Sequence, residues 1–223
     1  MPRQGFAAGK ASFHPMGFFG SSAAISRYRV EGQAEGPLLE TVRQGLSRHA
    51  ISDIDQQSEA RSIGWTCVDR PYAPSFEDGA FAIADFFLFA LRIDKKSIPS
   101  KVIQKHLAEA TEKRKAETGR DFLSRNEKKM LKEHVLNVLA MRIPATPSIY
   151  DILWAYPENE LWLFSTQKAA GEALESLFAK SFSLSLVRLF PYTMAEFHPG
   201  LSDGRRDLLN KLMPCSFAKR DGS

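Results

Sequence analysis

The residues of this sequence best suited to chemistry are cations, gathered in the segment KRKAETGRDFLSRNEKKMLKEHV at positions 113–135. From Arg92 to Val135 the chain has thirteen Lys or Arg against seven Asp or Glu, a net charge of +6, whereas all 223 residues together carry +4. Positive charge concentrated in one segment indicates an anionic partner, and nucleic acid is the commonest such partner.

The spacing of these cations suits one face of a helix. Four of them fall within about 100° of one another at 100° per residue: Arg125, Lys128, Lys129 and Lys132. An adjacent arc is apolar and could pack: Leu131, Val135, Val138 and Leu139. Phe122 is the one aromatic among the basic residues, so we expect contact with the phosphate backbone, insensitive to base sequence, rather than base stacking. The alternative is a solvated helix stabilised by pairs such as Glu109 with Lys113.

We therefore predict a DNA-binding surface built from the basic residues of this region. Its members are Arg92, Lys95, Lys96, Lys101, Lys105, Lys113, Arg114, Lys115, Arg120, Arg125, Lys128, Lys129 and Lys132. The predicted partner is double-stranded DNA, with single-stranded DNA as an open alternative.

Residue patterns typical of enzymes are missing from the sequence. The five histidines are scattered, and the two cysteines, Cys67 and Cys215, are too far apart for a metal motif. Phosphate-binding glycine loops and nucleophile elbows are absent as well. Glu127 and Lys129 have a spacing that suits a metal-dependent nuclease, but both fall on a helix. We predict no catalytic residue, no metal and no cofactor, and keep two alternatives: a metal-dependent exodeoxyribonuclease, and a protein-interaction module with an acidic partner.

The first part of the chain is expected to form a small sheet-plus-helix unit, β-α-β-β, over residues 24–96. Residues 25–31 alternate as in a half-buried strand, Gly36-Pro37 opens a helix, and SIGWTCV at 62–68 is strand-like. Two apolar runs follow, AFAI and FFLFALRI, and Ala84-Asp85 between them predicts a hairpin turn. The alternative is a continuous strand with a buried Asp85.

Next comes a predicted antiparallel helical hairpin, the arm, over residues 97–146. Pro99-Ser100 opens the first helix and Thr118-Gly119 ends it. Ser124 and Glu127 form a Ser-x-x-Glu capping box for a second helix, from about Arg125 to Arg142. Pro144 and Pro147 end that helix.

A second unit, β-β-α-β, is expected over residues 147–192, with strands in SIYDILWAY, ELWLFS and SLSLVRLF. The predicted fold class is therefore α+β: two small sheet-plus-helix units with an inserted antiparallel helical hairpin arm. Residues 1–23 are expected to be a disordered extension, and residues 193–223 a C-terminal tail. No apolar run is long enough to cross a membrane and no signal peptide is evident, so we expect a cytoplasmic protein.

Three segments in this order resemble the RdgC family of bacterial recombination-associated proteins: IGWTCVDRP at 63–71, LRIDKKSIPSKVIQKHLAEATEKRKAETGR at 91–120 and SRNEKKMLKEHVLNVLAMR at 124–142. The paired strands and helix at 149–182 continue the likeness, which covers roughly residues 24–192. The resemblance implies a non-catalytic, nucleoid-associated protein whose dimeric ring encloses duplex DNA in a positively charged hole. Members restrain recombinase filaments, and have been labelled exonucleases without an evident active site.

Carried over to this chain, the basic residues that match the family's arm are Lys101, Lys105, Lys113, Arg114, Arg125, Lys128, Lys129 and Lys132. Two departures are visible. The chain ends sooner after its last strand than is typical, which leaves an open dimer or a different oligomer as alternatives to a closed ring. Family members also place an aromatic near the end of the second arm helix, where this sequence has Ile143-Pro144.

Overall fold

The computed structural model describes residues 20, 23–197, 200–209 and 211. Most of the extension expected at 1–23, and Cys215 in the expected tail, therefore lie outside the described residues. The first elements are β1 (Ser26–Glu31), α1 (Leu38–Arg48), β2 (Arg61–Thr66), β3 (Ala82–Ile83) and β4 (Phe86–Lys95). The later ones are α2 (Ser100–Thr118), α3 (Arg125–Arg142), β5 (Thr146–Ala155), β6 (Glu160–Leu163), α4 (Lys168–Phe182), β7 (Ser185–Leu189), α5 (Pro191–Glu196) and α6 (Asp203–Leu209).

The strands form one antiparallel sheet in the order β2-β4-β5-β6-β1-β7, with β3 paired to β4 beyond the end of β2. This confirms an α+β fold, but the two expected units share a single sheet. Two pairings join the units: β4 pairs with β5 along its whole length, and β1, whose residues alternate between buried and exposed, pairs with strands of the second unit. Strand β1 pairs with β6 on one side and with β7 on the other, so the first segment of the chain completes the sheet of the second.

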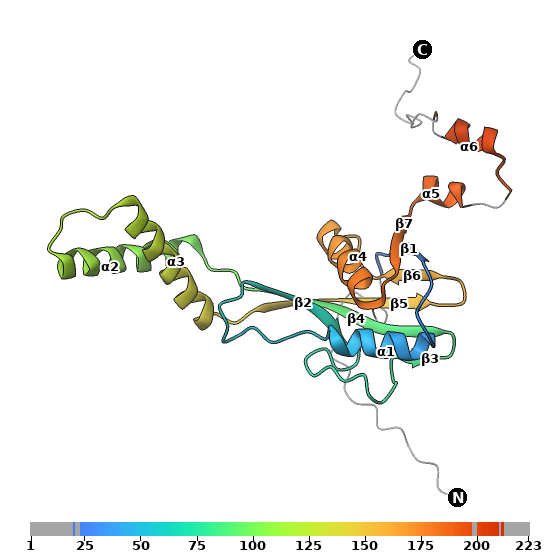
Figure 1. Ribbon diagram of the computed structural model, residues 1–223, viewed down its shortest axis with the longest axis horizontal. Helices are drawn as coiled ribbons and strands as arrows, with labels where there is room; N and C mark the ends of the chain where they lie inside the picture. Colours follow the sequence, from blue (N-terminus) through green and yellow to red (C-terminus); the bar gives the residue numbers. More distant parts are fainter. Residues whose placement is uncertain (1–19, 21–22, 198–199, 210, 212–223) are drawn as a thin grey trace, which may run out of the picture.

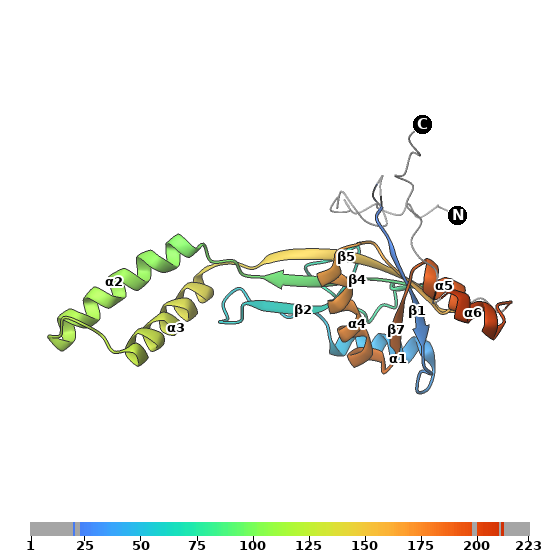
Figure 2. The same ribbon diagram turned by 90° about the horizontal axis from the view of Figure 1, so that it is seen from above.

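The core lies between the sheet and the two helices α1 and α4, which cover the same face (Figure 2). Aromatic rings dominate it. Trp65 meets Phe89 edge to face at 5.3 Å and stacks with Phe182 at 5.9 Å, measured between ring centroids. The indole Nε1–H of Trp65 donates to Ser181 Oγ at 2.8 Å, so the buried polar atom of this large side chain is satisfied.

The turn between β3 and β4 lies where the sequence predicts it. Ala84 has φ 51°, a left-handed conformation that suits a tight hairpin. Asp85 is exposed, so the alternative of a buried Asp85 in a continuous strand is wrong.

The arm leaves the sheet as an insertion between the neighbouring strands β4 and β5 (Figure 1). These strands pair along their whole length, from Phe86 opposite Ala155 to Lys95 opposite Thr146. The helices α2 and α3 continue outward from the paired ends and pack on each other, away from the helices of the body.

Gly64 in β2 is where two backbones come closest. His49 O accepts a hydrogen bond from Trp65 N–H, and Trp65 O accepts one from Ile51 N–H, both at 2.9 Å, so residues 49–51 run directly against the strand. A Cβ on Gly64 would lie 2.5 Å from Ile51 N and 2.8 Å from Ala50 C. Only a residue without a side chain fits there.

We expect Gly64→Ala to lower the free energy of unfolding by about 1–3 kcal/mol, because backbone atoms must move to admit the methyl group. The measurement is urea unfolding followed by circular dichroism. Gly204→Ala is the matched control, since a Cβ at that position in α6 meets nothing within 4 Å. Equal stability of the two variants would contradict this account of Gly64.

Candidate nucleic-acid interface

The second arm helix begins at the predicted capping box. Ser124 N–H donates to Glu127 Oε2 at 2.8 Å, and Glu127 N–H donates to Ser124 Oγ at 3.3 Å. Hydrogen bonds from the backbone and the hydroxyl of Ser124 lower the pKa of the Glu127 carboxyl. Glu127 is therefore occupied as a helix cap, which confirms the expected role and removes the nuclease-like spacing of Glu127 with Lys129 as a signal.

Six of the thirteen predicted cations are exposed with no carboxylate oxygen within 4 Å among the described residues. They are Lys95, Lys101, Lys113, Arg125, Lys128 and Lys132. Three of these, Arg125, Lys128 and Lys132, share one face of α3. Phosphate groups could approach them without displacing a protein partner.

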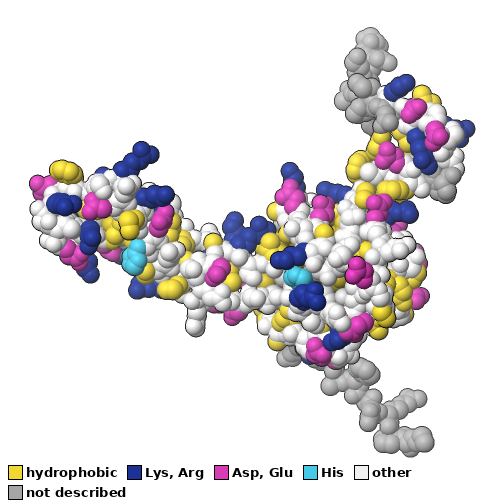
Figure 3. Space-filling view, viewed as in Figure 1, with side chains coloured by type: hydrophobic (Ala, Val, Ile, Leu, Met, Phe, Trp, Pro, Cys, Tyr) yellow, Lys and Arg dark blue, Asp and Glu magenta, His cyan; other side chains and the backbone are white. Residues whose placement is uncertain are grey.

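Five more cations form ion pairs with carboxylates of the arm. Lys105 pairs with Glu109 at 3.9 Å, Arg114 with Glu117 at 3.5 Å and Lys115 with Glu112 at 3.0 Å. Arg120 lies 3.7 Å from Glu127, and Lys129 lies 4.0 Å from Glu133. Lys113, expected opposite Glu109, is not its ion-pair partner; Lys105 is, and His106 Nδ1 lies 3.3 Å from Glu109 Oε2. Figure 3 accordingly shows cations on several sides of the arm with acidic side chains between them.

Arg92 is committed to the body of the protein. Its guanidinium donates to both carboxylate oxygens of the buried Asp94, at 2.7 and 2.6 Å, and to Pro71 O at 3.1 Å. It also lies over the ring of Tyr72, 5.2 Å from the centroid. A side chain held by this many contacts and only 14% exposed is a structural group, so we leave Arg92 out of the candidate interface.

Lys96 likewise does not face solvent. The residue is 6% exposed, and its ammonium donates to the carbonyl oxygens of Asp55, Gln57 and Ala140 at 3.0, 2.8 and 2.6 Å. The predicted phosphate contact at Lys96 is therefore not supported, because all three N–H donors already have partners. Sequence spacing alone gave no sign of this, since the neighbouring Lys95 is exposed.

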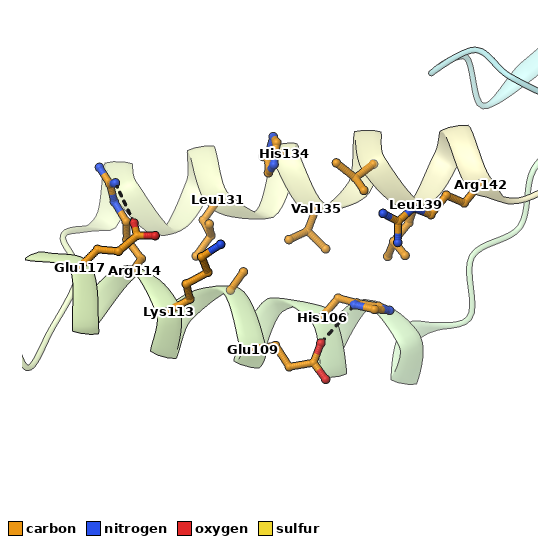
Figure 4. A pocket seen from close by; sticks show the side chains of 12 residues that line it. His106, Glu109, Lys113, Arg114, Glu117, Leu131, His134, Val135, Leu139 and Arg142 are labelled. Atoms are coloured by element: carbon orange, nitrogen blue, oxygen red, sulfur yellow. Dashed lines mark hydrogen bonds and ion pairs between the residues drawn. The ribbon is translucent and has the colours of Figure 1, made fainter.

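Between α2 and α3 lies a groove of about 520 Å³ (Figure 4). Its floor is apolar, with Leu131 and Val138 half-buried and Val135 buried, and its rim carries His106, His134 and Arg142. Arg142 is exposed and has no carboxylate within 4 Å among the described residues, which makes it a cation that the sequence analysis missed. Its place in the last turn of the predicted second helix was the signal that could have found it.

The arm ends in an exposed aromatic. Phe122 lies in the loop between α2 and α3 and is 78% exposed, while its neighbour Leu123 is 4% exposed. In the sequence Phe122 is the one aromatic among the basic residues, and Ile143-Pro144 stands where family members have an aromatic near the end of the second arm helix. The ring of Phe122 projects into solvent at the tip of the arm.

Among the residues that the structure describes, no three His, Cys, Asp or Glu side chains are grouped so as to hold a metal ion. Cys67, the cysteine that the structure describes, is buried and donates to Ser75 O at 3.1 Å, and burial raises the pKa of its thiol. No helix of the described part of the chain is long and apolar enough to span a membrane.

We expect Ser124→Ala to weaken the first turn of α3 by about 1 kcal/mol, because one backbone N–H loses its acceptor. Hydrogen exchange of the amides at 125–128 measures this local opening. Ser100→Ala is the control, since the N-terminus of α2 has no side-chain cap. If the two substitutions changed exchange equally, the capping box would not be what orders the second helix.

A protein-family model described as "Putative exonuclease, RdgC" matches residues 24–196. A search of curated proteins found no match. The matched residues include the whole sheet and both arm helices. The chain therefore belongs to the RdgC family, and this membership implies a recombination-associated DNA-binding role.

Proposed function

We propose that this protein binds DNA without sequence preference, as a homodimer, and modulates recombination by covering DNA rather than cutting it. The observation that carries this proposal, beside the family, is the row Arg125, Lys128 and Lys132 on α3, which is exposed and has no carboxylate within 4 Å among the described residues. Cations on flexible stems suit phosphate oxygens, and phosphates are the same for every base sequence.

Three further features support the proposal. Three more exposed cations without a carboxylate within 4 Å among the described residues, Lys95, Lys101 and Lys113, extend the charge from the root of the arm along α2. Aromatic side chains are rare among them, which favours backbone contacts over base stacking. The exposed Phe122 at the tip suits contact with a second copy of the chain, so that two arms could enclose DNA between them. Duplex DNA is the proposed ligand, and a nucleoid location would follow from binding it.

Binding is expected to fall steeply with salt. About six phosphate contacts would cost on the order of a thousandfold in affinity between 50 and 200 mM salt. Replacing Lys128, Lys129 and Lys132 together by Glu is expected to weaken binding to every DNA sequence alike. The slope of log affinity against log salt should become shallower by about three. Fluorescence anisotropy of labelled duplex and single-stranded DNA measures both quantities.

The matched control replaces three exposed lysines outside the arm, Lys168, Lys180 and Lys211, by Glu, which changes the net charge equally. Unchanged affinity and slope in the arm variant would show that the arm does not bind DNA. Equal losses of DNA affinity in both variants would show that net charge alone explains the effect. Sedimentation of the same complexes gives the number of chains on DNA, and a single chain per site would remove the homodimer.

The family's printed description names an exonuclease, so cleavage is the competing activity. We expect labelled DNA to stay full length during incubation with the protein in Mg²⁺ or Mn²⁺, and to be bound equally well in EDTA, since phosphate contacts by lysine need no metal. Denaturing gel electrophoresis is the measurement. The contradicting outcome is DNA that is shortened when divalent metal is present and stays full length in EDTA. If an identically purified variant with the three arm lysines replaced did not shorten the DNA, the protein would be a metal-dependent nuclease.

A further inference from the structure

The root of the arm holds a buried cation without a counterion. Lys96 is 6% exposed, and no carboxylate oxygen lies within 4 Å of its ammonium among the described residues. Buried lysines are rare and usually paired, because an ammonium loses much hydration free energy on burial. Here three carbonyl oxygens, those of Asp55, Gln57 and Ala140, accept its three N–H donors at 2.6–3.0 Å.

These three acceptors belong to segments that are far apart in the sequence. Lys96 directly follows β4, Ala140 lies in the last turn of α3, and Asp55 and Gln57 lie in the loop before β2. The last carbonyls of a helix have no partner within the helix and carry partial negative charge. The ammonium therefore satisfies the end of α3 and ties it to the body in one contact.

A second set of bonds holds the returning chain. Asp55 Oδ1 accepts a hydrogen bond from Ala145 N–H at 2.7 Å, just before β5 begins. Ala60 O accepts one from Lys96 N–H at 2.9 Å. One loop, residues 55–60, thus forms hydrogen bonds with both the segment that enters the arm, at Lys96, and the segment that leaves it, at Ala145. Farther out, α2 has no buried residue, so its own packing does not fix its direction relative to the sheet. The buried residues of the arm helices, Val135, Leu139 and Ala140, all lie on α3.

We propose that Lys96 and Asp55 form a clasp that positions the arm, so that DNA affinity depends on two residues that do not touch DNA. This inference rests on the proposed function. Without the clasp, the arm would sample many directions, and binding would have to order it at a cost in conformational entropy. Lys96 is then a positioning residue, in contrast to Lys95, which faces solvent and is free to meet phosphate.

Substitution of Asp55 tests the clasp, because the clasp and long-range electrostatics predict opposite changes in DNA affinity. Asp55→Ala removes a negative charge, and long-range electrostatics alone would then strengthen DNA binding. The clasp predicts weaker binding, by about threefold to tenfold, because Ala145 N–H loses its acceptor. Asp55→Asn is the control, since it removes the same charge but keeps Oδ1. It should bind DNA at least as well as the unaltered protein.

Lys96→Met supplies a second test through the salt dependence. The clasp predicts affinity about tenfold weaker with an unchanged slope, because the same phosphates are contacted once the arm is in place. Lys95→Met is the matched control, and should make the slope shallower by about one with little change in arm order. Circular dichroism and thermal unfolding show whether each variant folds. If Lys96→Met does not fold, the comparison of Asp55→Ala with Asp55→Asn tests the clasp.

The arm's direction is measured without DNA by pulsed electron spin resonance between labels at Ala116 on α2 and Glu158 beyond β5, in a background lacking Cys67 and Cys215. We expect one narrow distance distribution in the parent, and a broad one in Asp55→Ala and Lys96→Met. Unchanged distributions in both would overturn the clasp, and so would stronger binding by Asp55→Ala. A shallower slope for Lys96→Met with an unchanged distribution would make Lys96 a phosphate contact. If the parent protein failed to bind DNA, the proposed function would be wrong. The spin-label distance distributions would still show whether Lys96 and Asp55 fix the direction of the arm.

Discussion

The pairing of β4 with β5 is the constraint on which the rest of the molecule depends. The ladder runs without a break from Phe86 opposite Ala155 to Lys95 opposite Thr146. Strands paired in this way keep opposite Cα atoms about 5 Å apart, so the two ends of the arm leave the sheet side by side. An antiparallel helix pair is the simplest structure that can leave and return between such ends. The ladder therefore dictates the form of the arm before any arm residue makes a contact.

The cations of the arm region differ in how available they are. Arg92 and Lys96 are bound into the protein, and removing them from their partners would leave buried groups unsatisfied. Exposed pairs such as Lys115 with Glu112 contribute little to stability, so such lysines can exchange a carboxylate for a phosphate at small cost. If the arm binds DNA as proposed, the neighbouring carboxylates also repel the phosphates and weaken the attraction.

The parts of the structure that depend on neighbours in the sequence could be predicted. The capping box at Ser124, the hairpin at Ala84 and the limits of α3 all follow from residues within a few positions. The merging of two units into one sheet could not be predicted, because it depends on β4 pairing with β5 across the inserted arm and on β1 pairing with β6 more than 130 residues away. The site was predictable to the same extent. Lys128 lies on an exposed helical face as its spacing indicates, whereas the burial of Lys96 depends on a loop some 40 residues earlier.

The position of β1 between β6 and β7 has a consequence for biosynthesis. The first described strand cannot acquire both neighbours until the ribosome has delivered residues up to Leu189. Until β6 has been made, the apolar side of β1, with Tyr28 and Val30, has no sheet to join, while the arm, built from local contacts, is able to form early. Pairings between distant residues slow folding and leave strand edges open to aggregation. The nascent protein is thus vulnerable at its N-terminal strand, and a chain interrupted before β7 would leave one side of β1 unpaired.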